Sequence, residues 1–457
     1  MSEALLFVLV GGAVAGLLSG FPVALALGGV SILVALLGHL VNTVDLALLG
    51  ALPGRLVSIM VNETLVAVPL FVFMGTVLEK SKLAEELLVT MGQLFGNRRG
   101  GLGFAVLIVG AMLAASTGIV GATVVTMGLI SIPAMRRAKY KESLSCGLVC
   151  ASGTLAQLIP PSTVLILLGV MVQDANTQAQ LRMGIFSGDP LTVTDLFAAA
   201  LLPGLMLVGL YTVWMLLVAF RDRRNCPPLE MSDDMRDALV RKVLVAMVPP
   251  LALIVLVLGS ILSGLATATE SAALGGVGAL VLALCSGRFT RQQLSEAARS
   301  AMLISVMIYT MLIGATILSA VFRILGGEEV VASLLTLIPG GALGATLFVL
   351  GIMFVLGFLL DTFEIIFIVI PIFGPALLML GVDPLWFGVA AALVLQTSYL
   401  TPPFGFAIFY LQGVVDGLKL STVYRGVAPF VAIQLFAGVL IWWWPGMVTW
   451  LPGLLNS

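Results

Sequence analysis

Apolar runs long enough to cross a lipid bilayer recur along almost the whole chain. A membrane-spanning helix needs about 20 such residues, and many runs reach or approach that length. They lie near residues 4–20, 22–38, 62–78, 142–173, 195–220, 242–259, 267–286, 301–322, 385–413 and 427–446. This pattern predicts an all-α polytopic membrane protein.

Two further apolar segments, 101–135 and 341–380, are each divided by a short polar patch, "AASTGIVGAT" in the first and "GFLLDTFE" in the second. Each half is shorter than a full crossing, so we expect two re-entrant helical hairpins that enter and leave on one side. In 43–58, 80–95 and 289–300, apolar and charged residues alternate at helical spacing. Those three stretches predict helices lying in the membrane interface.

Two of the long apolar segments contain a proline pair, Pro160-Pro161 in the first half and Pro402-Pro403 in the second. Proline removes a backbone donor and clashes with the preceding turn, so each pair should break its helix. Unpaired backbone at membrane depth is tolerated only where it lines a cavity or meets an ion. A kink made for packing alone is the alternative, but a second pair that also follows a polar-tipped hairpin favours a binding site.

The spacing of these features repeats. Thr123 precedes Pro133 by ten residues and Asp361 precedes Pro371 by ten, and the proline pairs follow after 27 and 31 residues. Each half should make five crossings and one hairpin, and an odd number of crossings inverts the second copy. Inverted repeats with discontinuous helices are typical of secondary transporters. The predicted division is a first repeat at 1–220, a cytoplasmic linker at 221–241 and a second repeat at 242–457.

Composition agrees with a membrane protein and excludes a nucleic-acid partner. Hydrophobic residues make up 60% of the 457 residues, charged residues 10%, and the net charge is -1. With two hairpins, 19 of the 22 Lys and Arg fall on one face, and only Arg55, Arg182 and Arg323 fall on the other. The positive-inside rule makes the rich face cytoplasmic. The first apolar run, from Ala4, lacks a basic leader region and is expected to stay as a helix.

Nothing in the chain indicates an enzyme. There is no H-E-x-x-H or G-x-S-x-G motif and no pair of intramembrane aspartates. Cys146 and Cys150 lie four residues apart, but no further ligand stands near them, so no transition-metal site or cofactor is expected. His39 is expected to lie at the interface. A passive channel is disfavoured, because hairpins from two sides suggest alternating access.

The four broken or polar-tipped segments closely resemble the large membrane subunit, DctM, of tripartite ATP-independent periplasmic (TRAP) transporters. They read "LAASTGIVGATVVTMGLISIPAM", "ASGTLAQLIPPSTVLILLG", "GFLLDTFEIIFIVIPIFGP" and "QTSYLTPPFGFAIFYLQG". "GFPVALALGG" and "ATATESAALG" also match the family pattern. The amino-acid sequences of the two hairpins and an insertion near 174–195 resemble those of the family branch labelled mannitol/chloroaromatic or 2-oxo acid type.

The resemblance implies Na+-coupled import of a small organic acid, a carboxylate, by an elevator mechanism. It implies two partners, a small membrane subunit of the DctQ type and a periplasmic substrate-binding protein of the DctP type. It also implies a multi-pass protein of the bacterial inner (cytoplasmic) membrane. The alternative is a standalone Na+-coupled organic anion symporter that needs no binding protein.

The chain departs from the family pattern at a few positions. Many members carry a serine pair at the first hairpin tip, where this chain has Ile119 and Val120. Side-chain ligation there must rely on Thr117, Thr123 or backbone carbonyls. Ala268 replaces a usual proline, and Lys139 replaces a glycine usual before the next tyrosine. Neither change is expected to abolish function.

Sodium prefers oxygen ligands, which hydroxyls and backbone carbonyls supply. By analogy with the family, one sodium site would combine the first hairpin with the first broken helix, and another the second hairpin with the second. The predicted Na+-binding residues are Thr117, Gly121, Thr123, Gly153, Thr154, Gly357, Asp361, Gln396, Thr397 and Thr401. The predicted substrate-binding residues are Ser116, Ala122, Pro160, Thr362, Ser398 and Pro402.

Several charged residues keep alternative roles. Asp361 either ligates sodium or holds its hairpin tip by accepting backbone N–H bonds, and a carboxylate at membrane depth is a functional candidate. Glu364 is expected to make a structural hydrogen bond and Glu270 to cap a helix. Arg323, followed by Glu328 and Glu329, is expected to contact either the binding protein or lipid headgroups.

Overall fold

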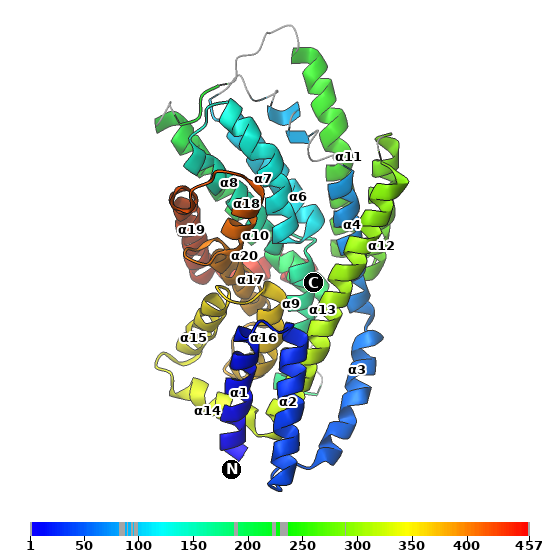
Figure 1. The fold of residues 1–457 in the computed structure, drawn as a ribbon, viewed down its shortest axis with the longest axis vertical. Coiled ribbons are helices and arrows are strands. Elements are labelled where there is room, and N and C mark those ends of the chain that lie inside the picture. The colour runs from blue at the N-terminus through cyan, green and yellow to red at the C-terminus, as the bar shows by residue number, and fades with distance from the viewer. Residues whose placement is uncertain are drawn as a thin grey trace.

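The fold was analysed in a computed structural model. It describes residues 2–81, 87–88, 90–92, 95, 99–186, 191–221, 225–228, 236–287 and 289–455, with side chains of the 236–287 segment described from 247. Every regular element in these ranges is a helix (Figure 1). Half of the predicted interfacial helix at 80–95 lies outside the described residues.

The chain begins with two antiparallel helices, followed by two helical segments joined at a bend (Figure 1). These elements are α1 (Ser2–Leu18), α2 (Val23–Leu40), the 3-10 turn η1 (Leu46–Ala51), α3 (Leu52–Met60) and α4 (Glu63–Lys80). Asn62 ends the first arm and caps the second, since its side chain accepts hydrogen bonds from the N–H groups of Thr64 and Leu65 at 3.0 and 3.2 Å. The two arms meet at a bend of 49°.

The first hairpin and the first broken helix come next, at the positions in the chain that the sequence predicted. They comprise α6 (Gly101–Thr117), α7 (Val120–Arg137), α8 (Glu142–Thr154), η2 (Leu155–Gln157) and α9 (Thr163–Arg182), with α10 (Val193–Arg221) after them. Gly118 and Ile119 separate the hairpin helices. Gly118 has a φ of 61°, and a side chain there would lie 2.7 Å from the backbone N of Thr163. Glycine therefore permits both the turn and its contact with the broken helix.

The second half repeats this order with its own additions. It contains α11 (Arg236–Leu262), α12 (Ala268–Cys285), α13 (Arg291–Ile324), α14 (Gly327–Leu337), α15 (Gly341–Leu356), α16 (Thr362–Met379), α17 (Pro384–Leu400), α18 (Phe406–Val414), α19 (Leu420–Trp443) and α20 (Gly446–Leu455). The helices α14 and α20 were not predicted from the sequence.

Two length-based predictions need correction. The stretch 289–300 is not a separate interfacial helix, because α13 runs unbroken for 34 residues from a Thr290–Gln293 capping box. The second half of the hairpin at 341–380 is not too short to cross, because α16 has 18 residues and a window apolar enough to span. However, 72% of that window is buried inside the protein. Helix α16 therefore differs from the other spanning helices in its burial by protein and not in its length.

The number of complete spans also differs from the ten predicted. Within the described ranges, six helices are long and apolar enough to cross a membrane, or up to eight if each bent pair counts as one span. Five further apolar helical stretches in these ranges have 10–17 residues, and of these only α17 ends at a proline break. Several long helices and a set of shorter pieces thus make up a multi-pass membrane protein.

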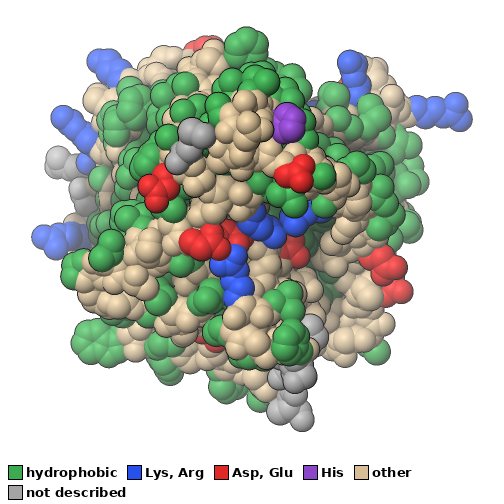
Figure 2. Space-filling view, turned by 90° about the horizontal axis from the view of Figure 1, so that it is seen from below, with side chains coloured by type: hydrophobic (Ala, Val, Ile, Leu, Met, Phe, Trp, Pro, Cys, Tyr) green, Lys and Arg blue, Asp and Glu red, His purple; other side chains and the backbone are tan. Residues whose placement is uncertain are grey.

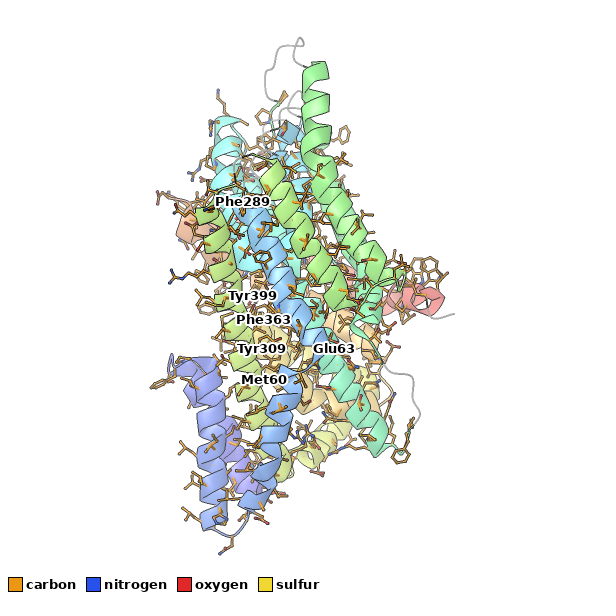
Figure 3. The ribbon with its side chains drawn as sticks, turned by 90° about the vertical axis from the view of Figure 1, so that its right-hand side faces the viewer. Met60, Glu63, Phe289, Tyr309, Phe363 and Tyr399 are labelled. Atoms are coloured by element: carbon orange, nitrogen blue, oxygen red, sulfur yellow. The ribbon has the colours of Figure 1, made fainter. Side chains whose placement is uncertain are left out.

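The packing places the hairpins and broken helices at the centre. Helix α9, after the first break, packs on α16 of the second hairpin, and α18, after the second break, packs on α7 of the first. On the periphery α2 packs on α13 and α4 packs on α12. Tyr399 and Phe363 lie near mid-height, close to the level of the α3–α4 bend between Met60 and Glu63 (Figure 3). The central helices are largely buried, whereas α1, α2 and α12 expose leucines and valines.

Candidate cation and substrate site

The tip of the first hairpin gathers buried oxygen atoms. The hydroxyls of Thr117 and Thr123 lie 2.7 Å apart. The Thr117 hydroxyl donates to the Leu113 carbonyl at 2.9 Å, and the Thr123 hydroxyl is within 2.9 Å of the Ile119 carbonyl. Both threonines are under 5% exposed. Oxygen ligands without formal charge suit a monovalent hard cation, and the sodium site at this tip stays a prediction.

This tip rests on the break of the first broken helix. The Thr163 hydroxyl donates to the Gly118 carbonyl at 2.8 Å, and the Ser162 hydroxyl donates to the Ala156 carbonyl at 2.7 Å. Pro160-Pro161, between the two helical halves, is a cis peptide and is buried. Side-chain hydroxyls thus bond to one carbonyl at the break, that of Ala156, and to one at the hairpin tip, that of Gly118.

The neighbouring residues Gly153 and Thr154 contact different parts of the protein. Gly153 lies against α7, where an added Cβ would be 2.3 Å from a methyl group of Val124. The Thr154 hydroxyl instead donates to the Ala151 carbonyl and lies 3.4 Å from the amide nitrogen of Gln434, which also donates to the Tyr211 hydroxyl at 2.7 Å. The Thr154 side chain therefore belongs to a second buried polar group, apart from the Thr117–Thr123 pair.

The second hairpin tip is organised around Asp361 at the start of α16. Its carboxylate accepts a hydrogen bond from the Tyr399 hydroxyl, which in turn accepts one from the Thr362 N–H at 2.7 Å. Glu364 accepts from the Asp361 N–H at 3.0 Å, which confirms its predicted structural hydrogen bond. Gly357 lies so close to α17 that an added Cβ would be 2.0 Å from the Ser398 hydroxyl.

Each tip also touches the broken helix of the other half. The amide nitrogen of Gln157, before the first break, donates to the Thr362 hydroxyl at 2.8 Å. An added Cβ on Gly121, in the first hairpin, would lie 3.2 Å from the ring of Tyr410 on α18. Two hairpin tips and two helix breaks therefore form one continuous polar region inside an apolar molecule.

The remaining predicted residues around the second break are buried or half-buried. The hydroxyls of Thr397, Ser398 and Thr401 donate to carbonyls one turn earlier, and Ser116 does the same in α6. Gln396 is fully buried, and its side chain interacts with the Tyr211 hydroxyl, so it joins the buried polar group of Thr154, Gln434 and Tyr211. Ala122 and Pro402 are half-buried.

Three residues of this region, Tyr399, Gln157 and Tyr410, were not predicted from the sequence. Tyr399 stands inside the quoted motif "QTSYLTPP", and Gln157 stands three residues before Pro160. A polar side chain beside a proline break was therefore a usable signal. Tyr410 carried none, because its contact with Gly121 joins residues 289 positions apart, and only folding brings them together.

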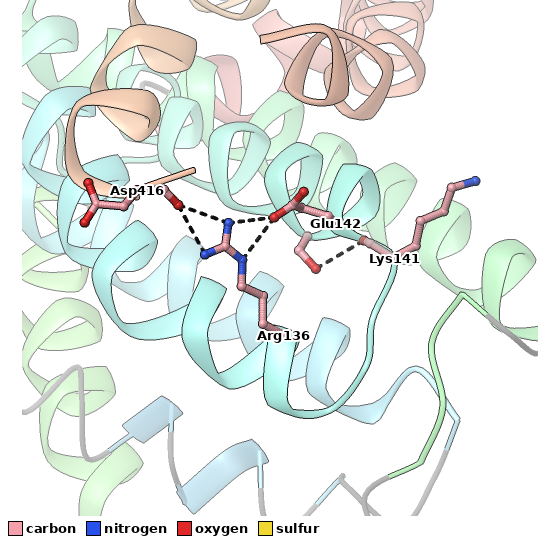
Figure 4. Close-up of polar contacts among 5 residues, drawn as sticks. Arg136, Lys141, Glu142 and Asp416 are labelled. Carbon is pink, nitrogen blue, oxygen red and sulfur yellow. Dashed lines mark hydrogen bonds and ion pairs between the residues drawn. The ribbon is translucent and has the colours of Figure 1, made fainter. Parts of the chain in front are cut away.

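Several charged residues outside this region have structural partners. Glu270 caps α12 through reciprocal hydrogen bonds with Thr267, as predicted. Arg136, at the end of α7, pairs with Glu142 at 2.6 Å and donates to the Asp416 carbonyl after α18 (Figure 4). Cys146 and Cys150 are buried, and no metal-ligand cluster occurs among the described residues.

Comparisons with known proteins identify relatives over nearly the whole chain. The sequence model of the family "Tripartite ATP-independent periplasmic transporter, DctM component" matches residues 10–447. The ectoine/5-hydroxyectoine TRAP transporter large permease UehC of Ruegeria pomeroyi is 27% identical, covering 96% of this chain and 97% of that protein. The C4-dicarboxylate TRAP transporter large permease DctM of Pseudomonas aeruginosa is 29% identical, covering 86% and 87%.

A sialic acid TRAP large permease, SiaM of Vibrio cholerae, is 26% identical over 86% of this chain and 87% of its own length. Among solved structures, the YdaH transporter of Alcanivorax borkumensis covers 89% of both chains with a TM-score of 0.63 and 16% identity. That likeness concerns the fold alone. The narrower resemblance to the mannitol/chloroaromatic or 2-oxo acid branch finds no support in these relatives, which are named for ectoine, C4-dicarboxylates and sialic acid.

Proposed function

Because the chain belongs to the DctM-component family of tripartite ATP-independent periplasmic transporters, we propose that it imports a small organic acid together with Na+. Like its relatives, the chain is a large permease subunit, and it is not an enzyme. The observation that carries the proposal is the meeting of two hairpin tips with two helix breaks. The hydrogen bonds of Thr163 to Gly118 and of Gln157 to Thr362 hold these parts together.

The sodium proposal rests on the chemistry of the two tips. In the first, the Thr117 and Thr123 hydroxyls with nearby carbonyls would replace part of the hydration shell of the cation. Gly121 and Gly153 would allow backbone to approach closely. In the second, Asp361 would supply charge and the segment from Gln396 to Thr401 would supply amide and hydroxyl oxygens. A bound cation must compete with hydrogen bonds already formed there, such as the one from Tyr399 to Asp361.

The substrate would sit between the tips. Ser116, Ala122, Pro160, Thr362, Ser398 and Pro402 would line its site, and no Lys or Arg belongs to that set. Its carboxylate would be met by helix N-termini, hydroxyls and sodium itself. This mode of recognition depends on the cation, which is a physical basis for coupling.

We further propose that the hairpins and broken helices move as one body in an elevator mechanism. The paired contacts of α9 with α16 and of α18 with α7 support a single central unit. The helices α2, α4, α12 and α13 would form the scaffold. The repeats proposed at 1–220 and 242–457, on either side of the 221–241 linker, would supply equivalent parts in inverted orientation.

The family implies a small membrane subunit and a periplasmic substrate-binding protein as partners. A DctQ-type subunit and a DctP-type protein would fill these roles. The proposed location is the bacterial inner membrane, with the face rich in Lys and Arg toward the cytoplasm. A standalone Na+-coupled organic anion symporter remains the second candidate, and the need for a binding protein separates the two.

Uptake into proteoliposomes tests the proposal. The chain and its small subunit would be reconstituted, an inward sodium gradient imposed, and labelled C4-dicarboxylates, ectoine and sialic acid offered with and without loaded binding protein. Uptake that needs sodium and the binding protein would support the proposal. Sodium-driven uptake without it would favour the standalone symporter. Uptake indifferent to sodium would rule out the coupling.

A further inference from the structure

A cavity of about 490 Å³ with both polar and apolar walls lies apart from the hairpin tips, between α3–α4, α9, α13 and α16. Arg55 and Arg323 line it, together with Asn62, Gln178, Ser319 and Asp174. Two of the only three cationic residues assigned to the external face therefore share one cavity. Charged side chains gather at the centre of this face of the molecule (Figure 2).

The neighbouring charges leave one guanidinium without an ionic partner. Glu328, only 7% exposed, pairs with Arg182 and also with Arg323, whose Nε lies 3.1 Å from its carboxylate. Glu329 is more distant, at 3.9 Å from Arg182. Among the described residues, Arg55 has no carboxylate within 4.0 Å. Glu328 therefore balances part of the charge of Arg323, and the contact of Arg323 with a binding protein or lipid headgroups stays a prediction.

We propose that this cavity is an external capture site for a carboxylate, with Arg55 as its main anchor and Arg323 as its second. Arg55 is exposed, and an arginine fork binds a carboxylate through two parallel hydrogen bonds. Asn62, Gln178 and Ser319 supply neutral hydrogen-bonding groups on the same walls. The inference rests on the proposed function for the direction of transport, but the binding chemistry stands on these side chains.

The cavity lies where a substrate could bind before it reaches the hairpin site. Its walls come from α3, α4 and α13 on one side, and from α9 and α16 on the other. Phe367 and Pro371 of α16 reach it, and the same helix begins at the Asp361 tip. Asp174 also lines the cavity and limits its positive potential. One carboxylate is accommodated better than several, and a cationic nitrogen on the same molecule would meet Asp174.

Thiol labelling tests the site without knowledge of the transported acid. Ser319→Cys would place a thiol on the cavity wall, in a chain carrying Cys285→Ser because Cys285 is the exposed native cysteine in the described part. Two methanethiosulfonate reagents of similar size, one ending in sulfonate and one in trimethylammonium, would react with this thiolate. Each reaction forms a mixed disulfide and releases methanesulfinate, so only the charge of the reagent differs.

We expect the anionic reagent to react about tenfold faster than the cationic one, relative to their rates with a free thiol. Arg55→Gln should reduce this preference to near unity. Arg55→Lys keeps the positive charge on the cavity wall and should therefore retain most of the preference. Equal rates, or equal effects of the two substitutions, would overturn the proposal.

Protection distinguishes the capture site from the hairpin site. In potassium buffer without sodium, succinate should slow labelling by the cationic reagent, whereas the neutral succinamide should not, and Arg55→Gln should remove the protection. Failure of succinate to protect would overturn the capture site even if sodium-driven uptake is observed. Protection without any sodium-driven uptake would support the capture site and refute the proposed coupling. An Arg55→Gln defect confined to uptake from the binding protein, without any charge preference, would overturn the site in favour of protein docking.

Discussion

Single residues in this chain are held in conformations or contacts that their type alone does not explain. Lys139 has a φ of 56°, in the left-handed region. The N–H groups of Lys139 and Tyr140 bond to the carbonyls of Arg136 and Met135, at 3.0 and 2.9 Å, which is the pattern of a Schellman motif. Glycine is favoured at this position because other residues pay a steric cost there. The family's usual glycine at Lys139 thus has a conformational reason.

Lys139→Gly is expected to raise the free energy of unfolding by about 1 kcal/mol, since it relieves that cost. Thermal unfolding of the purified chain in one detergent would measure the change. Lys139→Ala removes the same charge but keeps the strained conformation, so it should leave stability nearly unchanged. Equal stabilisation by both variants would instead point to the charge.

Tyr399→Phe removes the hydroxyl that bonds both Asp361 and the Thr362 N–H. A buried carboxylate and a buried N–H would each lose a partner, at a cost of about 1–3 kcal/mol. We expect the sodium concentration for half-maximal uptake to change by about tenfold. Tyr309→Phe on α13 is the matched control and should not alter it, because the Tyr309 hydroxyl makes no hydrogen bond within the described part of the chain. An unchanged sodium dependence in Tyr399→Phe would exclude Asp361 from the coupling site.

Helix contacts in the core depend on small residues at crossing points. Gly147 of α8 and Gly426 of α19 face each other, and an added Cβ on Gly147 would lie 2.1 Å from the Gly426 carbonyl. A Cβ on Gly426 would lie 1.9 Å from the carbonyl of Ser143. Backbones that approach this closely leave no room for a methyl group, as is common for helices packed in membranes. This crossing fixes α8, and with it the first break, against the C-terminal half.

Gly426→Ala should force α19 away from α8 and destabilise the chain by about 1–3 kcal/mol. Gly438→Ala lies in the same helix, where the new methyl would meet only a methyl of Leu393 at 3.7 Å. That control should be neutral or slightly stabilising, because alanine is the better helix former. The thermal unfolding midpoints of the two variants, compared with that of the unchanged protein, measure this difference in stability. A stable Gly426→Ala protein would mean that the crossing is looser than described.

At the scale of the whole molecule, Glu328 joins elements that the elevator proposal assigns to different bodies. Its buried carboxylate pairs with Arg182 of α9 and with Arg323 of α13. Removing one member of such a group leaves buried charge uncompensated, which is costly. The ion pairs therefore stabilise the arrangement in which the external ends of α9 and α13 lie together.

Glu328→Gln should weaken this arrangement and raise the rate at which Ser319→Cys reacts with a neutral thiol reagent by about fivefold. Glu329→Gln, with the same charge change on a side chain that is 70% exposed, is the control and should have little effect. If both substitutions change the rate equally, the effect is one of local charge. If neither changes it, α9 and α13 do not separate at this end.

The sequence was sufficient for the features that depend on local chemistry and on the lipid solvent. Apolar periodicity located the helices, the proline pairs located both breaks, and Thr267 with Glu270 marked a helix start. These follow from interactions within a few residues, where spacing along the chain is also spacing in space. The same locality explains the errors, since α13 continues through a charged stretch and α16 reaches spanning length while being enclosed by protein.

Long-range packing settled the partners of each polar group. Nothing near Asp361 in the chain identified Tyr399, and nothing near Gly121 identified Tyr410. Arg55, Arg323 and Asp174 come from three helices and meet only at one cavity. A buried polar atom must find a partner wherever the fold provides one. That requirement acts through space between distant segments, so it cannot be read from one segment at a time.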